Sequence, residues 1–190
     1  MSNAYFKVPE AVNEPVRSYA PGSNEHTSLI AKYNEMYNQT PIEVPLYIGS
    51  ERIFTADKGV LTPPHEHAKV LGHFNMGTEQ HVEMAIEAAL EARKKWAKMP
   101  WQDRAAIFLK AADLLAGPFR DKLNAATMLS QGKNVFQAEI DAACELIDFL
   151  RFNVQYMTQV YAEQPISSPG IWNRSEYRPL EGFIFALTPF

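Results

Sequence analysis

Hydrophobic residues recur at intervals of three and four through most of this chain, which is the spacing of amphipathic helices. This pattern predicts helices over residues 23–37, 78–99, 103–116 and 119–129. Polar capping residues and the glycines and prolines around their ends support these bounds. Short links between the last three predict a packed antiparallel layer of helices.

Strands are predicted in the part of the chain between the first two helices. Residues 42–48 and 52–55 flank the turn Gly49-Ser50 and predict a hairpin. A second strand pair is predicted over 60–62 and 69–74. Residues 5–21 contain three prolines and no helical period, which indicates an extended arm over a surface.

The longest predicted helix runs from about Val135 to Tyr161 and is hydrophobic on two roughly opposite sides. Such a helix is expected to be buried between layers. Glu145 falls within the second apolar stripe, where a carboxylate is costly unless it is paired or faces a solvated functional cavity. Pairing with Arg151 or a nearby lysine is the structural alternative. The first stripe contains Ile140, Ala143, Ile147, Leu150, Val154 and Met157, and the second contains Ala138, Ala142, Phe149, Phe152 and Tyr156.

The last residues form an uninterrupted apolar run, Phe183 to Leu187, followed by Thr188-Pro189-Phe190. The run predicts a strand covered on both faces in a parallel sheet. Ligands bind at the carboxyl ends of such strands, so the turn is a candidate site. A core strand with no element after it cannot bury both faces. We therefore expect these 190 residues to be the front part of a longer protein.

Composition narrows the possible functions. The net charge is −4 and the basic residues are scattered, which argues against a nucleic-acid partner. No apolar run approaches membrane-spanning length. The single cysteine, Cys144, lacks a basic neighbour in the sequence and is expected to be an inert core thiol in a reducing compartment. His65 and His67 lack a third ligand at suitable spacing, so we predict no metal site.

Several stretches resemble the aldehyde dehydrogenase superfamily. The segment from Gly182 to Phe190 is similar to the start of the nucleotide-binding domain of that family. Residues 131–153, with the motif Gln137-Ala-Glu-Ile-Asp, resemble its pyrroline-5-carboxylate dehydrogenase branch, as do 164–167 and 177–183. The resemblance covers most of the chain from Asn13 onward.

This resemblance implies an α/β fold, the N-terminal part of an aldehyde dehydrogenase-like fold with small hairpins, a helical layer and the start of a parallel Rossmann-like sheet. It divides the chain into an arm with a short helix (1–44) and the N-terminal part of the nucleotide-binding domain (45–165). The first strand of an oligomerisation hairpin (166–182) and a core strand entering the cofactor site (183–190) follow.

The resemblance also implies NAD-dependent oxidation of L-glutamate γ-semialdehyde to L-glutamate in proline catabolism. The nucleophilic cysteine would lie beyond this chain, so the chain alone is predicted to be inactive. Glu145 matches a glutamate that lines the substrate pocket, and Thr188, Pro189 and Phe190 match positions beside the cofactor. The implied location is the cytoplasm in a bacterium or the mitochondrial matrix in a eukaryote.

The alternation from Ile171 to Arg178 suggests an exposed strand. In the resembled family this segment adds to a sheet of a second subunit, which implies a homodimer or a larger homo-oligomer. An edge strand protected by its charges is the alternative. Two other functions stay open: an aldehyde dehydrogenase of different substrate choice, and a truncated, non-catalytic assembly module. The choice between NAD and NADP and the oligomer size are not fixed by the sequence.

Overall fold

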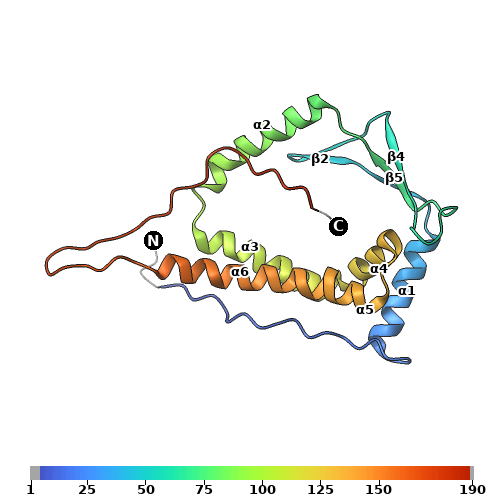
Figure 1. Ribbon diagram of the computed structural model, residues 1–190, viewed down its shortest axis with the longest axis horizontal. Helices are drawn as coiled ribbons and strands as arrows, with labels where there is room; N and C mark the ends of the chain where they lie inside the picture. Colours follow the sequence, from blue (N-terminus) through green and yellow to red (C-terminus); the bar gives the residue numbers. More distant parts are fainter. Residues whose placement is uncertain (1–4, 189–190) are drawn as a thin grey trace. The chain divides into compact units, whose positions relative to one another are not determined.

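The computed structural model describes residues 5–188, and the chain divides into two compact units that we describe separately (Figure 1). Each unit is built from three separate stretches of sequence. Unit 1 contains the residues up to 42 together with 60–72 and 101–163, and unit 2 contains 43–59, 73–100 and the residues from 164 onward.

Unit 1 is a layer of helices. Its elements are α1 (Asn24–Asn38), α3 (Trp101–Ala116), α4 (Arg120–Gln131), the single turn α5 (Val135–Gln137), the π-helix η1 (Ala138–Cys144) and α6 (Glu145–Ala162). Helix α1 packs against α4, and α3 runs beside α6 (Figure 1). The last three elements form one continuous helical rod, as the sequence predicts for 135–161, but with a π-helical insertion.

The helix ends of unit 1 follow local chemistry. The Ser23 hydroxyl accepts a hydrogen bond from the His26 amide at 3.2 Å and caps α1, which confirms the predicted start. Helix α4 ends at Gly132, whose φ of 68° is left-handed and suits glycine. Leu29 of α1 is 1% exposed and packs with Tyr19 and Ala125 in a small core.

A second core joins α3 to the long rod. Ala112 of α3 packs against Ala143 and Ile147, and all three are buried. The small alanine side chains let the two helices approach closely. The first apolar stripe of the long helix is therefore confirmed as a packing face, because Val154 further along α6 is buried as well.

The strands form two small sheets. They are β1 (Ile42–Val44), β2 (Leu46–Ile48), β3 (Glu51–Ile53), β4 (Lys58–Leu61) and β5 (Gly72–Asn75). Strands β2 and β3 form the predicted antiparallel hairpin, and the predicted pairing of β4 with β5 is also present. Strand β1 adds to the other side of β5, in the order β1-β5-β4, which the sequence pattern does not predict.

Unit 2 contains the amphipathic helix α2 (Glu79–Trp96), which contacts β2. The Thr78 amide donates to His81 Nδ1 at 3.0 Å, so the start of the helix is capped where the sequence predicts. None of the residues of α2 is buried, although its apolar positions recur as expected. Its apolar face is therefore only partly covered by the described residues.

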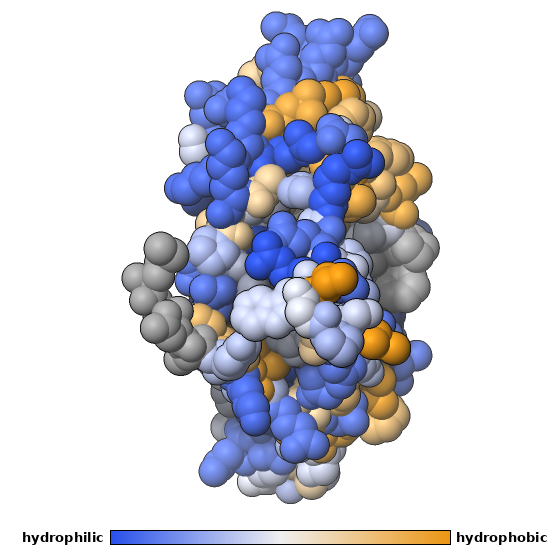
Figure 2. Space-filling model, turned by 90° about the vertical axis from the view of Figure 1, so that its left-hand side faces the viewer, coloured by the Kyte–Doolittle hydropathy of each residue, from blue (hydrophilic) through white to orange (hydrophobic). Residues whose placement is uncertain are grey.

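Residues 164–188 contain no helix or strand, so both strand predictions for this part of the chain are wrong. Phe183 is 47% and Ile184 79% exposed, since no described strand pairs with them to build the sheet that a buried strand requires. Residues 171–178 are exposed as predicted, but their backbone is held by side chains: Ser167 Oγ accepts from the Asn173 amide at 2.9 Å. Figure 2 is viewed from the side on which this segment lies in Figure 1, and it shows hydrophobic side chains scattered among hydrophilic ones.

Candidate functional site

The π-helix η1 sets which side chains of the long rod face inward. Glu139 and Cys144 are both buried although they are five residues apart, and so are the pair Ala138 and Ala143. In an α-helix a separation of five places two side chains about 140° apart. A π-helix bonds residue i to i+5 and therefore brings both pairs to the same face.

Glu139 is the most completely enclosed carboxylate that the structure describes, with none of its surface exposed. Its Oε2 accepts hydrogen bonds from the Tyr19 hydroxyl at 2.8 Å and from Asn124 Nδ2 at 2.9 Å. Its Oε1 accepts from the Arg17 backbone N–H at 2.8 Å. Arg120 donates to both oxygens, with Nε at 3.1 Å from Oε2. The arm (residues 5–20), α4 and η1 thus meet at one side chain.

Arg120 is equally enclosed, with 1% of its side chain exposed, and it connects a second acid. Its Nη1 pairs with Glu14 Oε1, and its Nη2 donates to the Pro15 carbonyl at 2.9 Å. Arg151 of α6 pairs with the other oxygen of Glu14 at 2.6 Å. Two arginines and two glutamates therefore form a charge-balanced cluster, which is the condition under which buried charges are tolerated.

The electrostatics of the cluster follow from these contacts. Burial by itself works to raise the pKa of Glu139, but the hydrogen bonds from Arg120, the Arg17 amide and Asn124 outweigh it and hold this pKa below its usual range. Burial also opposes the charge of Arg120, yet Glu139 and Glu14 raise its pKa. Burial and the hydrogen bond to Glu139 raise the pKa of Tyr19 to about 12.

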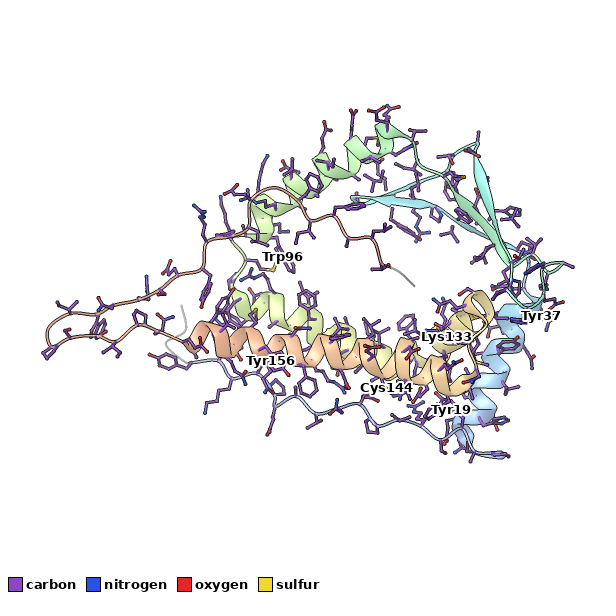
Figure 3. All side chains as sticks on the ribbon, viewed as in Figure 1. Tyr19, Tyr37, Trp96, Lys133, Cys144 and Tyr156 are labelled. Atoms are coloured by element: carbon purple, nitrogen blue, oxygen red, sulfur yellow. The ribbon has the colours of Figure 1, made fainter. Side chains whose placement is uncertain are left out.

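Cys144 is a buried free thiol, as predicted, but it does have a basic neighbour that the sequence pattern does not indicate. Arg120 Nη2 lies 3.4 Å from its Sγ. Burial and the charge of Glu139 nevertheless raise the pKa of Cys144 to about 11. Tyr19 on the arm and Cys144 on η1 both lie where the arm passes along the rod (Figure 3). The thiol is therefore protonated at neutral pH and is not a nucleophile.

An open cavity of about 770 Å³ lies along the opposite side of the rod from α3, and the arm forms one wall. Glu145, the predicted site residue, lines this cavity beside aromatic side chains of α6. The lining residues are Asn13, Glu14, Val16, Ile140, Cys144, Glu145, Asp148, Phe149, Phe152, Asn153 and Tyr156. Large aromatic walls with a few polar groups are typical of small-molecule sites.

Glu145 is exposed, so the prediction that the second apolar stripe is buried between layers is wrong along α6, although Ala138 of this stripe, on η1, is buried. Phe149 and Tyr156 of this stripe are 56% and 50% exposed and line the cavity instead. Arg151, the suggested ion-pair partner, binds Glu14 rather than Glu145. The carboxylate of Glu145 therefore faces an open cavity, which is the alternative that makes it a candidate functional group.

The arm is fixed to the rod by polar contacts at two further points. Asp148 accepts from Asn13 Nδ2 at 2.6 Å and from the Glu14 amide at 2.7 Å. Gln155 Oε1 accepts from the Ala11 amide at 2.6 Å. These contacts join segments more than 130 residues apart in the sequence. They confirm the extended arm and hold it as a wall of the cavity.

Unit 2 carries a second cavity, of about 620 Å³, between α2, β2 and residues 183–185. Its walls include Val82, Ile86 and Phe183 and are almost entirely apolar. The predicted cofactor residues follow directly in the sequence. Thr188 is exposed, whereas Pro189 and Phe190 lie outside the described residues. Thr188 by itself offers one hydroxyl, so the described residues do not form a complete dinucleotide site.

Within residues 5–188 no group of three or more His, Cys, Asp or Glu side chains is arranged to hold a metal ion. Among the same residues, no helix combines the length and apolar character needed to cross a membrane. The Arg120–Glu139 cluster is the main feature that sequence reasoning misses. A signal was present, since Glu139 lies within the motif Gln137-Ala-Glu-Ile-Asp that carries the family resemblance.

The model of the aldehyde dehydrogenase family matches residues 55–190, and the chain belongs to this family. The mixed α/β architecture predicted from the sequence is thereby confirmed, except for the parallel core strand. Glu145 and the α6 side of the cavity fall within the matched region, as does the segment that ends at Thr188, whereas the arm wall of the cavity precedes it.

The relatives define a narrower branch. The chain is 54% identical over 188 residues to the delta-1-pyrroline-5-carboxylate dehydrogenase of Agaricus bisporus, covering 98% of this chain and 34% of the relative. It is 44% identical over 181 residues to the mitochondrial enzyme of that name from Homo sapiens, covering 95% of this chain and 32% of the relative. The chain thus spans about a third of the length of these relatives.

A solved structure gives the same assignment. The crystal structure of the delta-pyrroline-5-carboxylate dehydrogenase from Mycobacterium tuberculosis bound with NAD is similar with a TM-score of 0.93 and 49% identity. The match covers 96% of this chain and 34% of that chain. The predicted resemblance to this branch is therefore confirmed.

Proposed function

We propose that this chain is the N-terminal third of an NAD-dependent pyrroline-5-carboxylate dehydrogenase, which oxidises L-glutamate γ-semialdehyde to L-glutamate in proline catabolism. The observation that carries the proposal is the 54% identity to such an enzyme across 98% of this chain. The cysteine nucleophile of the reaction belongs to the remaining two-thirds of the enzyme, because Cys144 is buried and its pKa is raised.

In this proposal Glu145 lines the substrate pocket. Its carboxylate is open to the cavity, and Phe149 and Phe152 provide an apolar wall that limits water. A substrate whose aldehyde is joined by a short carbon chain to an ammonium and a carboxylate group needs both kinds of surface. Glu145 therefore shapes the polar part of the pocket, while the aromatic side chains enclose the carbon chain.

The proposed cofactor contacts are Thr188, Pro189 and Phe190. NAD, when bound, supplies the hydride acceptor for aldehyde oxidation. The Thr188 hydroxyl can donate one hydrogen bond and accept others. The solved relative bound with NAD supports this cofactor.

Residues 171–178 are proposed to contact a second subunit in a homodimer or larger homo-oligomer. Trp172 is 98% exposed and Ile171 56%, so a subunit that covers this segment would bury apolar surface. The proposed location is the mitochondrial matrix if the source is a eukaryote, as the names of the relatives from Homo sapiens and Emericella nidulans suggest. In a bacterium it would be the cytoplasm.

The test of the activity is a chimera in which this chain is continued by the C-terminal two-thirds of the Mycobacterium tuberculosis enzyme. We expect NADH formation with pyrroline-5-carboxylate, and a lower kcat/KM with a simple aliphatic aldehyde. Glu145→Ala should lower kcat/KM by about tenfold or more. Glu163→Ala, at the exposed end of the same helix, is the control and should match the wild type.

A chimera that prefers the aliphatic aldehyde would instead indicate an aldehyde dehydrogenase of different substrate choice. Wild-type kinetics in the Glu145→Ala variant would contradict the role of Glu145. The subunit contact is tested by sedimentation of the chimera: Trp172→Ser should shift it toward monomer. An unchanged sedimentation coefficient would contradict that contact.

A further inference from the structure

We propose that Arg120 and Glu139 are positioning residues for Glu145: their buried ion pair holds the π-helical register that directs Glu145 into the cavity. The inference rests on the proposed function for the role of Glu145 in substrate binding. Neither side chain of the pair needs to touch substrate. They act through the backbone of η1.

The backbone link is direct, because Glu145 itself closes the π-helix. Its N–H donates to the Ile140 carbonyl, five residues back. If this turn relaxed to an α-helix, the same N–H would bond to the Asp141 carbonyl instead. Closing this turn with one residue fewer rotates the helical segment before the turn by about 100° relative to the segment after it. The π-turn therefore sets the angle between the segment that carries Glu139, which is bonded to α4 and the arm, and α6, which begins at Glu145 and packs on α3 through Ile147.

The π-helix is the less favourable backbone geometry, so something must hold it. Glu139 provides that constraint, because its carboxylate is bonded to two other parts of the chain, α4 and the arm. Arg120 and Asn124 hold it from α4, and Tyr19 and the Arg17 amide hold it from the arm. In an α-helical register Glu139 and Cys144 would lie about 140° apart and could not both remain buried beside Arg120.

The same pair also fixes the wall of the cavity opposite Glu145. Arg120 binds Glu14 and the Pro15 carbonyl, and Glu14 lines the cavity together with its neighbours Asn13 and Val16. Loss of the pair therefore loosens both the helix that carries Glu145 and the arm that faces it. An effect on substrate binding is expected although Glu139 does not line the cavity.

Hydrogen exchange on this 190-residue chain tests the register without any activity. In Glu139→Gln the amides from Ala143 to Glu145 should exchange at least about tenfold faster than in the wild type. Asp141→Asn is the matched control, because it makes the same acid-to-amide change on the same π-helix. Asp141 is partly exposed and pairs with Lys133 at 2.8 Å. In Asp141→Asn the amides from Ala143 to Glu145 should therefore exchange at close to the wild-type rate.

A mutant cycle in the chimera then tests whether the pair acts through Glu145. Glu139→Gln should lower kcat/KM for pyrroline-5-carboxylate by roughly tenfold to a hundredfold. Adding Glu139→Gln to Glu145→Gln should cause no further loss, because the two changes disrupt one function. Losses that multiply, or unchanged exchange in Glu139→Gln, would overturn the inference.

If Glu139→Gln does not fold, Tyr19→Phe carries the same test. It removes one donor to Glu139 and leaves the ion pair intact, so about two- to threefold faster exchange at Glu145 is expected. Equal exchange in Tyr19→Phe and the wild type would then reject the proposal. An inactive wild-type chimera would refute the proposed function, whereas the exchange experiment would still decide the role of Glu139 in the register.

Discussion

Replacing Arg120 by methionine tests how strongly the buried ion cluster stabilises unit 1. Methionine keeps much of the side-chain volume and removes the charge. Glu139 would then remain fully enclosed with three nitrogen or oxygen donors and the Cys144 thiol but no positive partner, while Glu14 would retain Arg151. Because the change removes one member of a buried pair, the desolvation cost of Glu139 is no longer offset.

The expected loss is about 3–5 kcal/mol, the usual cost of leaving one charge of a buried pair without its partner. We expect the lower end, about 3 kcal/mol, because Tyr19, Asn124 and the Arg17 amide still bond to Glu139. For a chain of this size each kcal/mol corresponds to about 2–4 °C, so Tm should fall by about 6–12 °C. The double variant Arg120→Met, Glu139→Leu should recover to within about 1–2 kcal/mol of the wild type.

The assay is urea unfolding followed by circular dichroism at pH 7 and at lower pH. The pKa of Glu139 is depressed in the folded state, so its contribution is complete above the unfolded value of about 4.3 and is lost as pH falls through the folded pKa. Without Arg120 that pKa rises and the loss should begin at higher pH.

Arg174→Met is the control, since Arg174 pairs with Glu176 in solvent and should contribute about 0–1 kcal/mol. A loss below about 1 kcal/mol in Arg120→Met, with an unchanged acid profile, would refute the reasoning.

Three further predictions concern packing, backbone geometry and titration. Leu29→Ala should cost about 2–5 kcal/mol in urea unfolding because Leu29 is buried, whereas Ile30→Ala, at an exposed position on the same helix, should cost less than about 1 kcal/mol; equal losses would contradict the assigned core. Gly132→Ala should cost about 1–3 kcal/mol, since φ is 68° and a Cβ would lie 2.9 Å from Pro64 Cγ; an unchanged melting temperature would show that the turn is not left-handed. The pKa values of Tyr19 and Cys144 are raised in the folded state, so their contribution to stability is complete below the unfolded pKa values and is lost as pH rises through about 11 to 12. Tyr19→Phe should therefore flatten the fall in Tm at alkaline pH. An identical fall in the variant and the wild type would contradict this.

Helices could be predicted from the sequence because their signals are local. The cap at Ser23, the apolar spacing of α2 and the left-handed Gly132 all lie within a few residues of the element that they define. The β2–β3 hairpin is similarly local, since a turn of Gly49 and Ser50 joins its strands. The addition of β1 to β5 joins segments about 30 residues apart and left no comparable local pattern.

The candidate site could be predicted only in part. Glu145 stood out because a carboxylate interrupted an apolar stripe, and the structure places it on the cavity. The stripe assumes 100° per residue, which holds along α6 but not across η1. The burial of Glu139 depends on that change of register and on Arg120 and Tyr19, which lie 19 and 120 residues away. No local pattern contains this information.

The final segment shows a different limit. The apolar residues from Phe183 to Leu187 have the composition of a core strand, but a strand forms only when neighbouring strands accept its backbone hydrogen bonds. In the described residues Phe183, Ile184 and Phe185 instead line a cavity with α2. The composition of residues 183–187 therefore indicates that they need to be buried, whereas their backbone conformation depends on whether neighbouring strands are present to pair with them.

The attachment of the arm has a consequence for synthesis on the ribosome. Asp148, which accepts a hydrogen bond from the Glu14 amide, is added to the chain 134 residues after Glu14. At about 5–20 residues per second the arm waits roughly 7–27 s before this partner has been synthesised. Arg120 is added 106 residues after Glu14 and 19 residues before Glu139, so for about 1–4 s of that interval it has no Glu139 beside it. Until η1 leaves the exit tunnel, the face of α4 that carries Arg120 therefore lacks the carboxylate that pairs with it in the folded chain.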